Sequence, residues 1–163
     1  MRATGLRLDD RDLEILKILQ VEGRITKAAL AERVNLSPTP CWERLKRLED
    51  EGLIERYEAR LCVKAFSPVT IVFMEAELDS HRAEDFSRFE QAIIDRPEIL
   101  ECWAVGGGID YLLKIIVRDV DSYQRLVDRM LEAQIGLRRY FTYVVTKSVK
   151  CETALPVDVL TNG

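Results

Sequence analysis

Residues 36–57 read LSPTPCWERLKRLEDEGLIERY, and this stretch decides the fold of the first part of the chain. Apolar residues recur in it at helical spacing, yet Pro38 and Pro40 occupy positions where the first helical turn belongs. The backbone N–H groups of a first turn have no intrahelical partner. Prolines there forfeit no hydrogen bond, and their fixed φ preorganises the turn. The stretch therefore predicts a helix with a rigid start, capped by Ser37 or Thr39.

The apolar stripe of this helix consists of Cys41, Leu45 and Leu48. With this stripe turned inward, the polar side chains point outward or to the flanks. In a recognition helix the first residues reach base edges, while basic side chains also hold phosphates. The candidate DNA-binding residues are therefore Ser37, Pro38, Thr39, Glu43, Arg44, Lys46 and Arg47. Trp42, on the flank, has two open roles, which are packing and a phosphate contact through its indole N–H.

The charge run ERLKRLEDE also has a simpler interpretation, because alternating charges usually form a solvated helix surface. The context favours DNA binding. Two shorter helices are predicted before it, at about residues 9–22 and 27–34, and LIERYEARL after it alternates like a wing strand. We therefore expect a winged helix-turn-helix domain over residues 1–56 that binds double-stranded DNA, then a hinge strand and linker over residues 57–68.

Residues 69–163 change to a pattern of strands alternating with helices. The predicted elements are a strand at 70–79, a helix at 82–95, a hairpin of ILECWAV and DYLLKIIV around three glycines, a helix at 120–133 and a strand at 138–149. The order βαββαβ is that of a ferredoxin-like unit. The fold class is therefore α+β, with an N-terminal winged helix-turn-helix followed by a ferredoxin-like βαββαβ domain for effector binding and oligomerisation.

One face of the predicted sheet is covered by the two helices, and the other face has no cover within the chain. Ile71 and Phe73 alternate onto this second face. Exposed apolar faces of this kind usually mark an interface, and most interfaces join identical copies. We therefore expect a homodimer.

Composition and charge exclude several classes of protein. The 163 residues contain no run approaching the roughly 18–20 apolar residues of a membrane span, and the first residues contain no apolar signal segment. We expect a cytoplasmic protein with no membrane partner. Residues 1–60 are electrically neutral and the net charge of −4 lies in the rest of the chain, so a basic DNA-binding face is small and local.

The metal-ligating residue types are sparse. Cys41, Cys62, Cys102 and Cys151 lie far apart in the sequence, and His81 is the one histidine. No CxxC pair exists for zinc or redox chemistry. We expect no metal and no cofactor, and reduced thiols that are mostly buried.

Three motifs in order, LSPTPCWERLKRLEDEGLIERY, GGGIDYLLK and YFTYVVTKSVK, resemble the Lrp/AsnC family of feast/famine transcription regulators. The resemblance extends from about Leu8 to Val149, and a closer likeness is to members encoded beside ectoine-degradation genes. It implies dimers that assemble further, into octamers, and an amino-acid effector bound between dimers near the G-x-x-D-Y loop. One departure is the segment IGLRR, where many relatives have a proline-glycine-valine turn, which implies a differently shaped ligand pocket.

Carried over by this resemblance, the effector-binding residues are Gly106, Gly107, Gly108, Asp110, Tyr111, Thr142 and Val144. Physical chemistry is consistent with a loop of this kind. Successive glycines let backbone N–H groups approach a carboxylate, and the carboxylate of Asp110 can pair with an α-ammonium group. The simpler alternative is a hairpin turn in which Asp110 accepts a hydrogen bond from its own backbone.

Two other functions remain open beside that of a regulator. Sirohaem decarboxylases resemble the same two-domain plan, but an enzyme of this kind needs histidines and arginines in its cavity, and His81 is the one histidine here. We therefore expect no enzyme and no catalytic residue. A ligand sensor that no longer binds DNA is the second alternative, and a salt-dependent gel shift separates it from a regulator.

Overall fold

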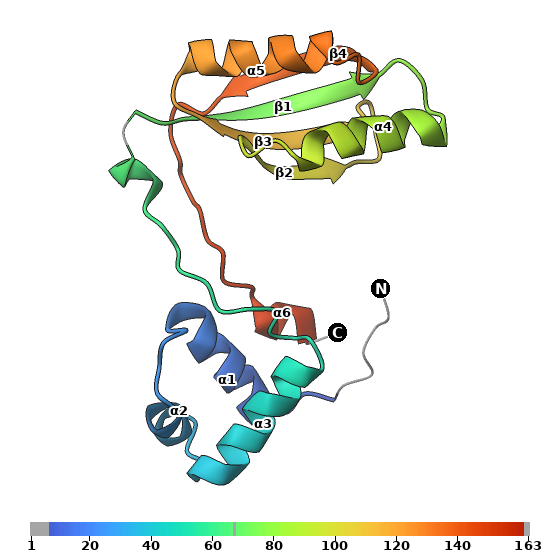
Figure 1. The fold of residues 1–163 in the computed structure, drawn as a ribbon. Coiled ribbons are helices and arrows are strands. Elements are labelled where there is room, and N and C mark those ends of the chain that lie inside the picture. Colours follow the sequence, from blue (N-terminus) through green and yellow to red (C-terminus); the bar gives the residue numbers. More distant parts are fainter. Residues whose placement is uncertain (1–6, 67, 162–163) are drawn as a thin grey trace. The chain divides into compact units, whose positions relative to one another are not determined.

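The computed structural model describes residues 7–66 and 68–161, which form two compact units (Figure 1). The first unit, here the helical unit, comprises the chain up to Arg60 together with the segment from Lys150 onward. The second, here the sheet unit, is Leu61–Val149. Each unit has its own hydrophobic core of buried residues, as separate domains do.

The helical unit contains α1 (Asp10–Val21), α2 (Lys27–Arg33), α3 (Pro38–Asp50) and the short α6 (Val157–Thr161). Each of the first three begins at a recognisable cap. The Asp9 side chain accepts from the Asp12 amide at the start of α1, and the Thr26 side chain accepts from the Ala29 amide at the start of α2. Ser37 is the N-cap residue of α3, so Pro38 takes the first helical position, as predicted.

Apolar side chains of the first three helices close the core of the helical unit. Its buried members are Ile15, Leu16, Leu30, Ala31, Val34, Cys41, Leu45 and Leu48. The stripe predicted for α3 therefore faces inward, and the opposite face of α3 is left to solvent.

The segment predicted as wing and hinge strand is not a strand. Residues 55–62 have no regular secondary structure, and a 3₁₀ turn follows at Val63–Ala65. Alternation of polar and apolar side chains indicates a segment with two different faces. A strand also needs a neighbouring strand for its backbone hydrogen bonds. Within the part of one protomer that the structure describes, this segment has no such neighbour.

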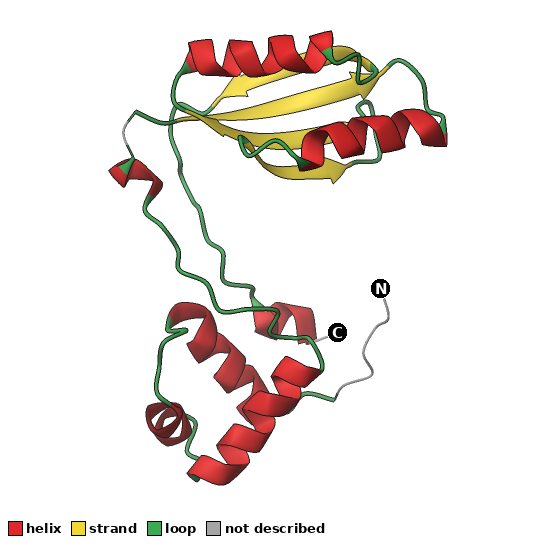
Figure 2. Ribbon diagram, in the orientation of Figure 1, coloured by secondary structure: helices red, strands yellow, loops and turns green. Residues whose placement is uncertain are grey.

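The sheet unit has the predicted order of elements (Figures 1 and 2). They are β1 (Thr70–Leu78), α4 (Ala83–Ile94), β2 (Ile99–Ala104), β3 (Tyr111–Val117), α5 (Val120–Glu132) and β4 (Leu137–Val144). The four strands pair antiparallel in the order β2-β3-β1-β4. This topology confirms the expected α+β, ferredoxin-like class.

Both helices pack on one face of the sheet, around Val72, Met74, Phe89 and Leu126, which are all fully buried. β4 is shorter than predicted because its neighbour β1 begins at Thr70. The last bond between them runs from the Val145 amide to the Ile71 carbonyl, so the following residues have no partner strand.

The other face of the sheet, here called the open face, has no helix on it. Strand pairing puts Phe73 beside Lys114 and Tyr143, and Trp103 beside Leu112. Paired residues share a face, so aromatic and aliphatic side chains collect here. Trp103, Phe141 and Tyr143 each remain 42–51% exposed. The open face therefore carries exposed aromatic side chains together with the ion pairs Glu77–Arg139 and Glu101–Lys114.

The C-terminal segment belongs to the helical unit, whereas the sequence-based boundary placed residues 69–163 in one domain. Val157 packs against the helical core, Lys17 Nζ lies 2.6 Å from Asp158 Oδ1, and the Gln20 side chain bonds both backbone groups of Leu155. α6 has five residues, too few for a periodic signal in the sequence.

Two smaller expectations concern membrane spans and the burial of the cysteine thiols. In the described ranges no helix has the length and apolar character needed to cross a membrane. The expectation of mostly buried thiols is wrong, because only Cys41 is buried, Cys102 is partly buried, and Cys62 and Cys151 are exposed. Burial raises the pKa of the Cys102 thiol to about 11, which leaves it protonated and unreactive at neutral pH.

Candidate functional site

Six of the seven predicted DNA-binding residues are exposed. Five of them form the outward face of α3 and are Ser37, Pro38, Thr39, Glu43 and Lys46; the sixth is Arg47. No hydrogen bond or ion pair within the described residues engages the side chains of Thr39, Glu43 or Lys46, and the Ser37 hydroxyl makes no capping bond. These polar groups are therefore available to an external partner. An exposed helix start with free hydroxyl and charged groups can dock against base edges and phosphates.

The ring of Trp42 packs against the side chain of Lys27 and remains partly exposed. Lys27 Nζ lies over its ring, 3.1 Å from the ring centroid, and the residue is 39% exposed. A cation on an aromatic face is held by the ring quadrupole. This contact joins α2 to α3 beside the outward face.

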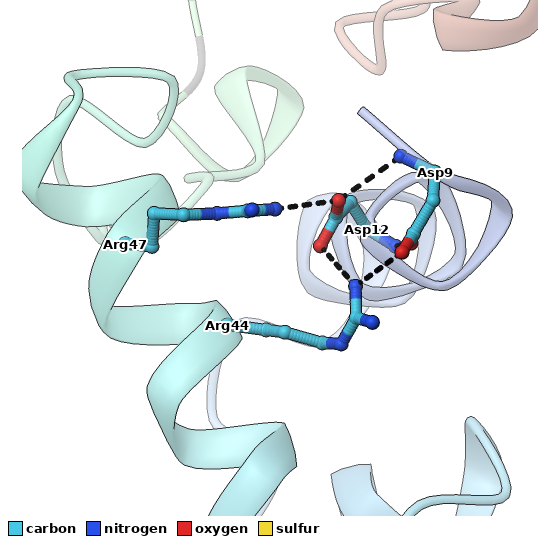
Figure 3. Close-up of polar contacts among 4 residues, drawn as sticks. All are labelled: Asp9, Asp12, Arg44 and Arg47. Carbon is cyan, nitrogen blue, oxygen red and sulfur yellow. Dashed lines mark hydrogen bonds and ion pairs between the residues drawn. The ribbon is translucent and has the colours of Figure 1, made fainter. Parts of the chain in front are cut away.

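Arg44 and Arg47, the other two predicted residues, are both turned towards α1 (Figure 3). Arg44 Nη1 donates to Asp9 Oδ2 at 2.6 Å and to Asp12 Oδ1 at 2.9 Å. Arg47 Nη2 donates to Asp12 Oδ2 at 2.6 Å. Asp12 is only 1% exposed, whereas the two guanidinium side chains are 30% and 42% exposed. The four side chains form a neutral cluster, here called the α1–α3 ion cluster.

The cluster shifts the pKa of Asp9. Its hydrogen bond from Arg44, and then that from the Asp12 amide, hold the pKa of the Asp9 carboxyl below its ordinary value of 3.8. A lowered folded-state pKa means that the folded protein binds this proton less readily than the unfolded chain. The stabilisation is therefore present above the ordinary pKa and is lost as the pH falls through the lowered one.

We expect the helical unit to lose stability as the pH falls from about 5 to about 3, and Asp9→Asn to flatten this dependence. Asparagine keeps an acceptor for the cap and removes the charge. Urea unfolding followed by Trp42 fluorescence, in a Trp103→Phe background, measures the helical unit alone. Asp119→Asn is the control, because this N-cap carboxylate also has a lowered pKa but lies in the sheet unit. Identical pH profiles for Asp9→Asn and its parent would contradict the expectation.

The second predicted constellation surrounds the glycine loop between β2 and β3. Gly106, Gly107 and Gly108 are exposed, and Gly107 has φ of 154°. Residues with a side chain rarely adopt this backbone conformation, so position 107 requires glycine. With no side chains, the loop leaves its backbone open to a ligand.

Asp110 lies at the base of this loop and fastens it to β1. Its Oδ2 accepts from the Leu78 amide at 2.8 Å, and its Oδ1 lies 3.0 Å from His81 Nε2. The carboxylate is 16% exposed. Asp110 therefore accepts a backbone hydrogen bond from a neighbouring strand, not from its own turn. His81, which also stacks on Phe86, completes this contact and was not predicted as a site residue.

The other predicted effector residues are not gathered at the loop within one protomer. Tyr111 is 2% exposed, and its hydroxyl donates to Glu90 Oε1 at 2.7 Å. Burial and Glu90 both raise the pKa of Tyr111. Thr142 and Val144 lie on β4, with β1 between them and β3, and the Thr142 hydroxyl bonds that of Tyr123 at 2.6 Å.

A surface pocket lies away from the loop. It has a volume of about 520 Å³, and its lining residues are Phe66, Pro68, Val69, Glu98, Ile116, Val117 and Arg118. These residues include the end of β3, whereas the glycine loop precedes the start of that strand. The pocket is therefore not the predicted effector site. Across the described ranges no cluster of three or more His, Cys, Asp or Glu residues is arranged to hold a metal ion.

Comparisons with known proteins agree with the two-unit architecture. Residues 8–55 match the model of a winged helix-turn-helix DNA-binding domain, and residues 71–155 match that of the Lrp/AsnC ligand binding domain. Over 149 residues the chain is 52% identical to the transcriptional regulatory protein DoeX of Halomonas elongata, covering 91% of this chain and 94% of that protein.

Two further relatives extend this similarity. The leucine-responsive regulatory protein of Escherichia coli K12 is 40% identical over 153 residues, covering 94% of this chain and 93% of that protein. A transcriptional regulator of Neisseria meningitidis, solved as an L-Met complex, superposes with a TM-score of 0.88 at 34% identity, covering 94% of this chain and 99% of that one.

Proposed function

This chain belongs to the Lrp/AsnC family of DNA-binding transcription regulators, and on that premise we propose that it reads DNA with the exposed face of α3 and senses an amino acid with its sheet unit. The relatives are transcriptional regulators, so we assign it no catalytic role. A cytoplasmic location fits a protein that acts on DNA. The exposed start of α3, with its unengaged polar side chains, is the observation that carries the proposal.

The positions and charges of the α3 side chains indicate which part of the DNA each one contacts. Ser37, Pro38 and Thr39 form the helix start, which in a helix-turn-helix enters the major groove. Glu43 and Lys46 follow one and two turns later on the outward face. Glu43 can accept from a cytosine amino group, and Lys46 can bind a phosphate or a guanine.

We expect Lys46→Gln to weaken binding to a duplex from the promoter of the protein's own gene, and to reduce the slope of log K against log salt by about 0.9 for each protomer that contacts the DNA, or about 1.8 for a dimer. The slope counts the phosphate charges neutralised. Fluorescence anisotropy at several salt concentrations measures both quantities. Lys147→Gln, an exposed lysine of the sheet unit, is the control and should leave them unchanged. If the unsubstituted protein showed no salt-dependent binding, the chain would be a ligand sensor without DNA-binding function.

We also propose that a second copy covers the open face, which gives a homodimer, and that dimers assemble further, into octamers. The exposed aromatic side chains of this face, Trp103, Phe141 and Tyr143, support the first step. A dimer carries two copies of α3 and reads two half-sites about one or more DNA turns apart, roughly 34 Å per turn.

The proposed effector is an amino acid or a diamino acid. Its carboxylate would bind N–H groups of the loop Gly106–Gly108, and its ammonium group would lie near Asp110. Thr142 and Val144 of another protomer complete the site, because within one protomer β1 separates them from the loop. The L-Met bound to the N. meningitidis regulator supports this ligand class, and the acidic net charge of residues 61–163 supports including diamino acids.

Asp110→Asn should weaken effector binding about 10- to 100-fold, because a hydrogen bond to a charged group contributes about 1.5–3 kcal/mol. Asparagine keeps an acceptor oxygen for the Leu78 amide, so the hairpin is retained. Calorimetry with L-methionine, L-leucine and ornithine gives the affinities. Asp79→Asn, an exposed carboxylate nearby, is the control. Equal affinities in Asp110→Asn and its parent would place the effector elsewhere, and DNA binding should be unchanged in both variants.

A further inference from the structure

The α1–α3 ion cluster contains a carboxylate that is unusual for its burial. Among the residues whose side-chain burial the structure describes, Asp12 is the one charged residue that is buried. Both of its oxygens are used, since Oδ1 accepts from Arg44 and Oδ2 accepts from Arg47 and from the Asp9 amide. A buried carboxylate is costly unless it is paired and hydrogen-bonded. The hydrogen bonds from these two arginines therefore offset the cost of burying the Asp12 carboxylate.

Arg44 and Arg47 are three residues apart on α3, one turn along the same flank. Each contacts the same carboxylate on α1. The apolar contacts of Cys41, Leu45 and Leu48 are non-directional, and they permit small rotations of α3. Two charged hydrogen bonds of defined geometry restrict such rotations. Arg44 and Arg47 together therefore set both the rotation of α3 and its position along its axis.

The same contacts pair the two guanidinium groups with carboxylates at the flank of α3. Two aspartates and two arginines make the cluster neutral, and the side chains of Arg44 and Arg47 are 30% and 42% exposed. Thr39, Glu43 and Lys46 have no intramolecular partner among the described residues and are exposed. The outward face and the ion cluster therefore have separate tasks.

We propose that Asp12 is the positioning residue of the DNA-reading helix, and that Arg44 and Arg47 act through Asp12 to orient α3 instead of binding phosphates. This proposal rests on the proposed function of α3 in DNA binding. It predicts that the cluster controls sequence discrimination, because discrimination depends on where α3 presents its side chains to base edges. The phosphate contacts that dominate non-specific binding would come from elsewhere.

The test compares Arg47→Gln, Arg47→Lys, Asp12→Asn and Lys46→Gln in the full-length protein. Each variant is titrated by anisotropy with a duplex from the protein's own promoter and with a random duplex of equal length, at several salt concentrations. Circular dichroism first establishes that each variant is folded at the working temperature. Since Asp12→Asn removes a buried charge and can prevent folding, the partly exposed Arg47 provides the primary variant.

For Arg47→Gln we expect about 10-fold weaker binding to the promoter duplex, less than about a 2-fold change on the random duplex, and an unchanged salt slope. Arg47→Lys should restore binding, because a lysine can donate the single bond that Arg47 makes to Asp12. Lys46→Gln should instead weaken binding to both duplexes and reduce the slope by about 0.9 per DNA-bound protomer, or about 1.8 for a dimer.

Two results would overturn the positioning role. A reduced slope with parallel losses on both duplexes in Arg47→Gln would mean a direct phosphate contact. A lower Tm with both affinities unchanged would mean that the cluster only stabilises the fold. No binding by the unsubstituted protein to either duplex would instead overturn the proposed function, so the two failures are distinguishable.

Discussion

Phe73→Asp is expected to leave the protein monomeric at micromolar concentration. Phe73 lies in the middle of the open face, between Lys114 on β3 and Tyr143 on β4. In a monomer the new carboxylate stays in water beside Lys114. In the proposed dimer it would be buried against a second sheet, and burial of a charge without a dedicated partner costs several kcal/mol. A loss of about 3 kcal/mol weakens association more than 100-fold.

Sedimentation velocity over a range of concentrations measures this change. Ile94→Asp is the matched control, since Ile94 is a 71% exposed aliphatic residue on α4 of the same unit and lies outside the open face. It should sediment like the parent. If Phe73→Asp also sediments like the parent as an oligomer, another surface holds the copies together.

The second large effect is expected in the core of the sheet unit. Phe89 on α4 is fully buried, and its ring centroid lies 4.6 Å from that of Tyr111. Phe89→Ala removes this contact and leaves a cavity, and changes of this kind cost about 3–5 kcal/mol. The two units have separate cores, so the helical unit should keep its stability.

Urea unfolding followed by fluorescence distinguishes the units, because the two tryptophans are divided between them. With Trp103 alone, in a Trp42→Phe background, the midpoint should fall strongly in Phe89→Ala. Ile94→Ala, on the exposed side of the same helix, should change the free energy of unfolding by less than about 0.5 kcal/mol. A small effect of Phe89→Ala would mean that the core relaxes to fill the space.

Local signals in the sequence were sufficient to predict α1 to α5 and β1 to β4 in their order, but not α6. Asp9, Thr26 and the prolines of α3 each mark a helix start through a short-range hydrogen-bonding rule, and alternation in residues 70–79 marks β1. The open face with Phe73 follows from the same alternation. These features depend on neighbours within a few residues, which periodicity and capping rules describe.

Features that depend on distant partners could not be predicted in this way. The outward direction inferred for Arg47 came from helix geometry alone, and its pairing with Asp12 spans 35 residues of sequence. The wing strand was predicted from alternation although its partner was unknown. The predicted effector residues Asp110 and Thr142 were joined by family resemblance, and within one protomer β1 lies between the strands that carry them.

The return of the C-terminal segment to the helical unit has a consequence for synthesis on the ribosome. Residues 61–149 are continuous in the sequence, so the sheet unit can fold as soon as it has emerged. α1 to α3 emerge earlier, but Val157 and the partner of Lys17 arrive only after that whole stretch has been translated. The unit whose helices are made first is thus completed last, because the segment that closes the helical unit is the last to leave the ribosome.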